Sequence, residues 1–260
     1  ERLVLRANSR IRSTQIGLAA SIGLDHLPTR PHPRVVILSA GPDLVEPGQS
    51  LKADEEFETN SWLLTTAVRE VGAIGYRVHS IPDDEEELLA VIEDQLVRAD
   101  LIVISGERND DSFDLITRTL QKMGEITTLD LAIENSGRHN FGQIGPDKTP
   151  VVTLPGDPIN AYISFELFVR PMIRTMLGVA TIHRPSVKAK LEKAISSTPG
   201  TRSYVRAILS EDATSVRALE IQDEISTLSD ANSFIALSEK DETIEAGASV
   251  NVVVLERRYI

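Results

Sequence analysis

A group of aspartates follows an apolar run that is typical of a buried strand. Asp110, Asp111 and Asp114 come a few residues after Leu101–Ser105, where the chain passes into a predicted helix. Carboxylate oxygens are ligands that Mg²⁺ prefers, so these side chains could hold a magnesium ion. Carboxylates are also common at helix starts, where they interact favourably with the helix dipole. A solvated acidic loop that begins a helix is the favoured interpretation, and a metal site is the alternative.

Two other loops carry glycine and proline where a predicted strand ends. Ser39–Asp43 reads Ser-Ala-Gly-Pro-Asp, and Leu154–Pro158 reads Leu-Pro-Gly-Asp-Pro. In open α/β sheets, ligands bind outside the carboxyl ends of the strands, and helix N-termini there offer N–H groups to phosphate. A purely structural role also explains the second loop, because glycine allows a tight turn and proline suits the first turn of a helix. The structural role is favoured for that loop.

The elements that position these loops alternate between strand and helix patterns. The continuous apolar runs Arg34–Ser39 and Leu101–Ser105 are typical of strands covered on both faces. The alternation predicts an α/β fold with three layers, in which helices cover both faces of a mainly parallel sheet. Further strands are expected at Tyr76–Ile81 and near 126–133, 141–144 and 151–154, and helices at Gln15–Leu24, Asn60–Val71, Asp83–Arg98, Phe113–Met123 and from Pro158 to near Met176.

Capping residues mark where two of these helices begin. Asn60 is expected to cap the helix that ends at Gly72. Trp62 lies on the apolar face of that helix, so it is expected in the core or in an interface. Asp83 is expected to cap the next helix, with Glu86 completing a capping box.

The sequence pattern changes after Gly178. Short strand candidates separated by turns such as Thr198-Pro199-Gly200 predict a small all-β domain, either a barrel or a sandwich. The chain is therefore divided into a connector at residues 1–33, an α/β domain at 34–180 and a C-terminal β-domain at 181–260. The strand candidates are Val187–Ile195, Ser203–Leu209, Val216–Ile221, Ser233–Leu237 and Val250–Leu255.

The composition excludes several classes of protein. The 260 residues include no cysteine, which excludes disulfides and thiolate metal sites. A net charge of -12 opposes binding to nucleic acid. No apolar run approaches the roughly 18 residues that cross a bilayer, so we expect a cytoplasmic protein without membrane insertion. The histidines show no paired spacing, and His139 is expected in a surface loop. The chain begins at Glu1, so we expect a fragment or a processed form.

The order and spacing of the loops resemble the molybdopterin molybdotransferases, the family of the MoeA proteins and the gephyrin E domain. This resemblance covers nearly the whole chain and implies a homodimer that binds adenylylated molybdopterin, cleaves the adenylate and inserts molybdate with the help of a divalent cation. Besides the three loops, it rests on Glu58–Ser61, Pro82–Asp84, Phe165–Pro171, Pro199–Arg202 and Ala231–Leu237.

The resemblance also implies roles for individual residues. Asp43, Asp83 and Asp114 match catalytic acids, although Asp83 is equally explained as a helix cap, and Asp43 and Asp114 are the expected Mg²⁺ ligands. The residues expected to contact the ligand are Gly41, Asn60, Ser105, Gly106, Ser136, Arg138, Pro155, Gly156, Pro158 and Arg202.

The sequence departs from the family pattern where phosphate or molybdate would lie. The family's loop Gly-Gly-Val-Ser-Val-Gly keeps only Gly106, and Glu107 follows it. Glu134 and Gly137 stand where the family's Lys-Pro-Gly-Lys-Pro segment has lysines. Glycines let a backbone approach a phosphate closely, and lysines attract it. Losing two lysines and gaining acids could cost about 5 kcal/mol, which is more than a thousandfold in affinity.

We therefore expect a molybdenum cofactor biosynthesis protein whose catalysis is impaired or lost. One interpretation is an enzyme that tolerates these changes and uses Mg²⁺ with adenylylated molybdopterin. The alternative is a non-catalytic dimeric scaffold that needs no cofactor and binds a protein partner near the β-domain, as gephyrin does, with bacterial cell division as a further precedent. The altered loops favour the scaffold.

Overall fold

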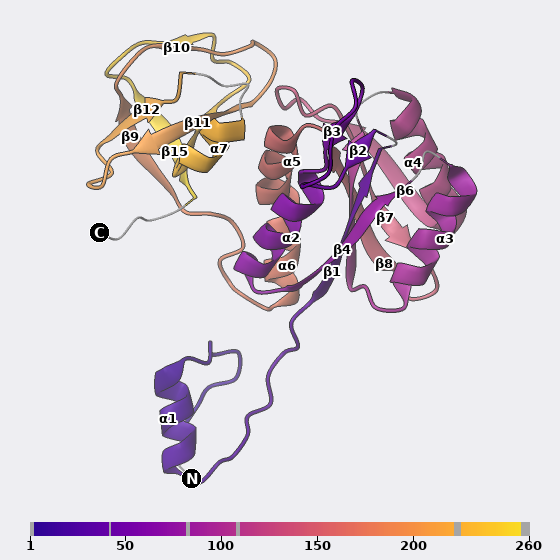
Figure 1. Cartoon of the computed structure of the whole chain (residues 1–260). Helices are drawn as coiled ribbons and strands as arrows, with labels where there is room; N and C mark the ends of the chain where they lie inside the picture. Colours follow the sequence, from indigo (N-terminus) through magenta and orange to yellow (C-terminus); the bar gives the residue numbers. More distant parts are fainter. Residues whose placement is uncertain (1–2, 42, 82–83, 108–109, 221–224, 256–260) are drawn as a thin grey trace.

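The computed structural model describes residues 3–41, 43–81, 84–107, 110–220 and 225–255. Its larger part is built on a six-stranded sheet with the order β4-β1-β5-β8-β7-β6 (Figure 1). The pairs β1–β4, β1–β5 and β5–β8 are parallel, whereas β7 runs antiparallel to both of its neighbours. The strands are β1 (Arg34–Ala40), β4 (Ile74–Ile81), β5 (Leu101–Glu107), β6 (Gly124–Asp130), β7 (Arg138–Ile144) and β8 (Thr149–Pro155).

Helices cover both faces of this sheet (Figure 1). One face packs against α2 (Asn60–Val71) and a continuous helix made of α5 (Pro158–Ser164), the π-helical turn η1 (Phe165–Val169) and α6 (Arg170–Met176). The other face packs against α3 (Glu85–Leu96) and α4 (Asp110–Met123). Alternate side chains of a strand point to opposite faces, so Val35 and Ile37 enter the first core while Val36 and Leu38 enter the second. The expected three-layer α/β fold is confirmed.

The second domain is a closed five-stranded barrel in the order β11-β12-β9-β15-β13, which settles the choice between barrel and sandwich. Its core consists of small aliphatic side chains such as Ile235 and Val252, both fully buried. One short helix, α7 (Ile225–Asp230), was not expected from the sequence. The barrel strands are β9 (Ser186–Leu191), β11 (Ser203–Leu209), β12 (Ser215–Ala218), β13 (Ser233–Leu237) and β15 (Ser249–Val254), and β10 (Ile195–Ser196) pairs with β14 (Thr243–Ile244).

Backbone and apolar contacts join the two domains. Arg202 donates its N–H to the Ala132 carbonyl at 2.8 Å, and its own carbonyl accepts from the Glu134 N–H at 3.0 Å. Ile159 and Ile163 of α5 form a small core with Phe234 of the barrel. The barrel is thereby held beside the first part of the α5–η1–α6 helix.

The N-terminal segment contains α1 (Ser13–Ser21), two or three residues earlier than the expected helix at Gln15–Leu24. Figure 1 shows α1 below the two domains, where an extended segment links it to β1. Among the described residues, no helix is both long enough and apolar enough to cross a membrane.

Two local expectations were wrong. Thr59 rather than Asn60 is the N-cap of α2, and the Asn60 side-chain oxygen makes no hydrogen bond within the described residues. Asp84 caps α3, its carboxylate accepting from the Glu87 N–H at 2.9 Å, while Asp83 lies outside the described residues. Trp62 is 50% exposed and so lies outside the core, with the Arg77 guanidinium 4.1 Å from its ring centroid; its place in an interface stays a prediction.

Candidate functional site

The predicted ligand loops meet at one edge of the sheet. The parallel strands β1, β5 and β8 all end at this edge, at Ala40, Glu107 and Pro155. Because β7 runs antiparallel to β8, its first residue, Arg138, lies at the same edge. The topology therefore brings loops from distant parts of the sequence together where open α/β sheets bind ligands.

A buried hydrogen-bond network fixes three of these loops to one another. The Asn60 side-chain amide donates to Ser105 Oγ at 2.8 Å and to the Gly156 carbonyl at 2.7 Å. Ser105 Oγ in turn donates to the Pro155 carbonyl at 2.9 Å. Asn60 and Ser105 are both buried, and the small cavity beside them, about 80 Å³, is also lined by Gly106, Gly156 and Pro158. Within this network, Asn60 and Ser105 position the loops.

Gly106 permits a close approach, but the neighbour is the protein's own backbone. Its φ is +142°, and a Cβ atom built at this position would lie 1.9 Å from the Ala40 carbonyl oxygen. The absence of a side chain thus lets the ends of β5 and β1 come together. Gly41 also has a positive φ, +159°, but a Cβ there would meet only the Leu44 side chain, at 3.0 Å, and no backbone atom.

Arg138 and Asp114 form a partly exposed ion pair at this edge. Arg138 Nη1 lies 3.5 Å from Asp114 Oδ1, and the guanidinium lies over the Phe113 ring at 4.1 Å from its centroid. The side chains are 36% and 54% exposed, so the pair contributes little to stability and can open at small cost. A guanidinium held over an aromatic ring is well placed to bind a phosphate or a carboxylate.

The structure does not assemble a complete metal site from the residues it describes. No three His, Asp or Glu side chains among them lie close enough to hold an ion. Asp43 is exposed in the loop before β2 (Leu44–Val45), its carbonyl accepting from the N–H of Glu56 in β3 (Glu56–Phe57) at 2.9 Å. Magnesium ions commonly bind through one or two carboxylates plus phosphate oxygens of a substrate. Asp43 and Asp114 fit that pattern only with a phosphate ligand present.

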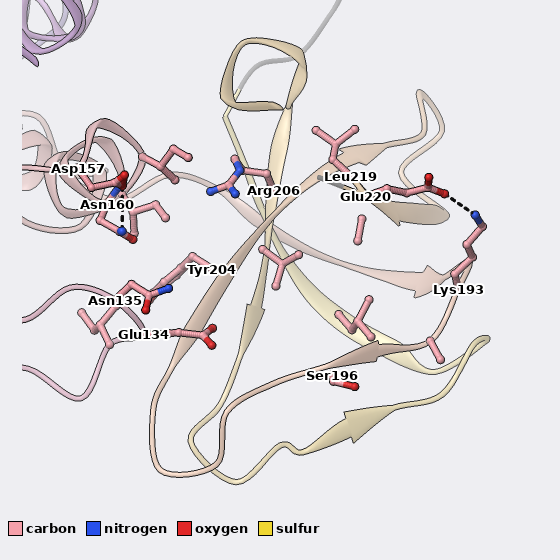
Figure 2. Close-up of a pocket in the computed structure, with 17 residues that line it drawn as sticks. Glu134, Asn135, Asp157, Asn160, Lys193, Ser196, Tyr204, Arg206, Leu219 and Glu220 are labelled. Atoms are coloured by element: carbon pink, nitrogen blue, oxygen red, sulfur yellow. Dashed lines mark hydrogen bonds and ion pairs between the residues drawn. The ribbon is translucent and has the colours of Figure 1, made fainter. Parts of the chain in front are cut away.

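A larger pocket opens between this edge and the barrel (Figure 2). Its volume is about 540 Å³, within the range of small-molecule sites. Glu134 and Asp157 line it from the α/β domain, and Lys193, Arg206 and Glu220 line it from the barrel side.

Charged groups in this pocket are largely paired within the protein. Glu134 Oε1 accepts from Thr198 Oγ1 at 2.6 Å, and Lys193 Nζ lies 2.8 Å from Glu220 Oε1. Arg206 Nε donates to Thr227 Oγ1 at 2.8 Å. The Asp157 carboxylate accepts from the Asn160 N–H, so it already occupies a donor at the beginning of α5 where a phosphate could bind.

Ser136 and Arg202 have structural contacts as well. Ser136 is buried, with its Oγ 3.3 Å from Ser164 Oγ. The Arg202 side chain lies 3.4 Å from Glu239 Oε2 at the surface, while its backbone joins the two domains.

His139 is fully buried, so the expectation of a surface residue was wrong. Its Nε2 lies 3.1 Å from Ser164 Oγ, and the rings of Phe141 and Phe168 pack against it. Burial lowers the pKa of His139, and the ring is therefore neutral at pH 7. It belongs to the core behind the site.

Sequence reasoning gave no individual role to several residues of this region, although Glu58 belongs to a segment that carries the resemblance. Glu58 is buried and its carboxylate accepts from the Ser61 N–H at 2.7 Å, which satisfies the beginning of α2. Arg77 lies 3.6 Å from Glu58 Oε2 and 2.5 Å from Glu46 Oε1. Arg206 is buried within β11, and an arginine inside a strand of otherwise apolar residues was a signal that could have identified it.

Comparisons with known proteins agree with the fold and with the loops. The family described as "Probable molybdopterin binding domain" matches residues 37–175, and "MoeA C-terminal region (domain IV)" matches residues 188–255. Molybdopterin molybdenumtransferase 1 of Mycobacterium tuberculosis is 30% identical over 262 residues, which cover 97% of this chain and 62% of the relative. Gephyrin of Dictyostelium discoideum is 24% identical, covering 97% of this chain and 40% of its own length.

A solved structure gives the same result. The molybdopterin biosynthesis MoeA protein of Pyrococcus horikoshii superposes with a TM-score of 0.84 at 26% identity, covering 98% of this chain and 62% of that structure. The chain thus spans about three fifths of the length of the bacterial and archaeal relatives named here. With one family match over more than half of the chain and a second over the barrel, the chain belongs to the MoeA and gephyrin E-domain family of molybdenum cofactor biosynthesis.

Proposed function

We propose that the chain binds adenylylated molybdopterin at the carboxyl edge of its sheet, and that its capacity to insert molybdate is impaired or lost. The observation that supports this most directly is the pairing of charged groups at the edge. Arg138 faces Asp114, Glu134 accepts from Thr198, and Asp157 accepts from the Asn160 N–H. A ligand phosphate must therefore displace internal partners before it gains its own, which lowers its net affinity.

Arg138 is the residue best suited to hold a ligand phosphate. Its guanidinium offers a planar fork of donors, and it leaves Asp114 at small cost because both side chains are partly exposed. The released Asp114 carboxylate, with Asp43, then suits a Mg²⁺ ion shared with the phosphate oxygens. When bound, Mg²⁺ would neutralise charge on those phosphates.

Equilibrium binding of adenylylated molybdopterin, with and without Mg²⁺, tests this proposal. We expect a dissociation constant between about 10 µM and 1 mM, weakening when Mg²⁺ is chelated. Binding tighter than this, together with molybdate insertion, would contradict impaired catalysis. No binding at millimolar ligand by the folded protein would contradict the proposed ligand and favour the scaffold.

We also propose that the protein forms a homodimer through its N-terminal segment. In α1 and the following turn, Leu18 and Ile22 are 40% and 50% exposed, and their spacing of four residues puts them on the same side of the helix. Exposed apolar side chains that lie together mark association surfaces. A second copy of the chain would cover them and remove that area from water.

Sedimentation equilibrium tests the homodimer. We expect the wild type to be dimeric at about 100 µM and Leu18→Asp to be monomeric, because a carboxylate cannot be buried unpaired in an apolar contact. Ser13→Asp adds the same charge at the exposed beginning of α1, where an acid is tolerated, and should stay dimeric. A monomeric wild type, or a Leu18→Asp variant that still dimerises, would contradict this interface.

A further inference from the structure

Three arginines gather in a pocket far from the carboxyl edge of the sheet. Arg170 and Arg174 belong to α6, and Arg184 belongs to the connector between the domains. Arg174 comes 16 residues after Pro158 in the same continuous helix, which corresponds to about 24 Å along its axis. The pocket has a volume of about 420 Å³ and is bounded by the end of α2, by α7 and by Leu255.

The arginines are only partly neutralised by acidic side chains. Arg184 forms a two-point ion pair with the buried carboxylate of Glu166, with nitrogen–oxygen distances of 2.8 Å and 2.7 Å. Arg170 Nε lies 3.5 Å from that same carboxylate, so one acid serves two guanidinium groups. Glu70 lines the pocket as well, which leaves these five side chains with one surplus positive charge.

The arginines have few hydrogen-bond acceptors in this pocket. Arg170 is 8% exposed, and its buried Nε, 3.5 Å from the Glu166 carboxylate, makes an ion pair with it but no hydrogen bond within the described structure. Arg174 is partly exposed and donates through Nε to the Thr181 carbonyl at 2.5 Å. A ligand that supplies oxygen acceptors would add charge-assisted hydrogen bonds to these guanidinium groups.

The electrostatic environment points in the same direction. Burial lowers the pKa of Arg170, and repulsion from Arg184 lowers it further. Burial also lowers the pKa of Arg174, followed by repulsion from Arg10 and from Arg184. Guanidinium groups that destabilise one another's charge create a site where an anion is favourable.

We propose that this pocket binds a small organic oxyanion, a phosphate monoester or carboxylate of metabolite size. Arginine forks match the oxygen geometry of both groups. The volume suits a ligand larger than a bare ion, and Val71, Leu228 and Leu255 offer apolar walls for its organic part. Because the walls come from both domains, an occupant would contact the α5–η1–α6 helix, the connector and the barrel together.

Calorimetric titration at constant ionic strength tests the site with glycerol 3-phosphate, citrate and inorganic phosphate as probes. We expect at least one organic probe to bind saturably with a dissociation constant of about 1 mM or lower, and to raise the unfolding temperature where chloride does not. A preference for glycerol 3-phosphate or for citrate would distinguish phosphate from carboxylate recognition. If none of the probes shows saturable binding at roughly 10 mM, ten times the expected dissociation constant, the proposal is overturned.

Substitutions locate the binding. Arg174→Gln should weaken binding about ten- to hundredfold, because it removes charged donors without disturbing the buried Arg184–Glu166 pair. Arg118→Gln makes the same charge change on the exposed surface of α4 and should leave binding unchanged. Equal affinity in wild type and a folded Arg174→Gln variant would overturn the assignment.

Discussion

The substitution Glu134→Lys should tighten the binding of adenylylated molybdopterin by about ten- to a hundredfold. The change replaces a negative charge in the pocket beside the barrel with a positive one, and a hydrogen bond to a charged group contributes roughly 1.5–3 kcal/mol. Among the described residues, the only hydrogen bond of the Glu134 side chain is from Thr198, which is exposed. The protein should therefore tolerate the lysine with little loss of stability. Titration of both proteins with the same ligand preparation measures the difference.

A matched variant separates a local effect from a general change in charge. Glu93→Lys makes the same substitution on the exposed face of α3, outside the pocket, and should leave the affinity unchanged. Gly137→Lys would restore the second lysine of the family pattern at a greater cost in stability. Gly137 has a φ of +65°, a conformation that costs a residue with a side chain about 1–2 kcal/mol. If Glu134→Lys binds no better than the wild type, the loss of positive charge at this position did not weaken the site.

The sheet and the small all-β domain were predictable because their signals are local, although the choice between barrel and sandwich was not. Val35–Leu38 is a continuous apolar run that is typical of a strand covered on both faces, and the strands of the second domain are separated by turn residues. The helix from Asn60 ends at Val71 as expected, since Gly72 takes the left-handed conformation that closes it.

The contacts that build the site were not predictable in this way, because they join distant parts of the chain. The amide of Asn60 meets partners 45 and 96 residues away in the sequence, which no capping pattern reveals. His139 is buried because Phe141 and Phe168 pack against it, although a polar residue near a loop is usually exposed. Trp62 lies outside the core, and its ring contacts the Arg77 guanidinium, a residue of the next strand that the helix pattern does not reveal.

Gly106 permits a close approach, as expected, but the group that approaches it is the protein's own backbone and not a phosphate. The resemblance implied that glycine admits a phosphate, whereas the structure shows the Ala40 backbone in the place that a Cβ would need. Gly106 is therefore required by the fold itself. Its retention, where the other family glycines are replaced, is explained without a ligand.

We accordingly expect Gly106→Ala to lower the free energy of unfolding by roughly 2–5 kcal/mol, one of the largest single-residue effects in the protein. The new methyl group would overlap the Ala40 carbonyl oxygen, and only a backbone shift of β1 or β5 relieves that contact. Gly41→Ala is the matched control at the end of the neighbouring strand, because Gly41 also has a positive φ, +159°, but its Cβ would meet only the end of a flexible Leu44 side chain. It carries the conformational cost without the overlap with backbone, so it should cost about 1–2 kcal/mol. Urea unfolding of the three proteins measures both values. Similar stability for Gly106→Ala and Gly41→Ala would mean that β1 and β5 can separate at this edge, and a phosphate could then approach Gly106 after all.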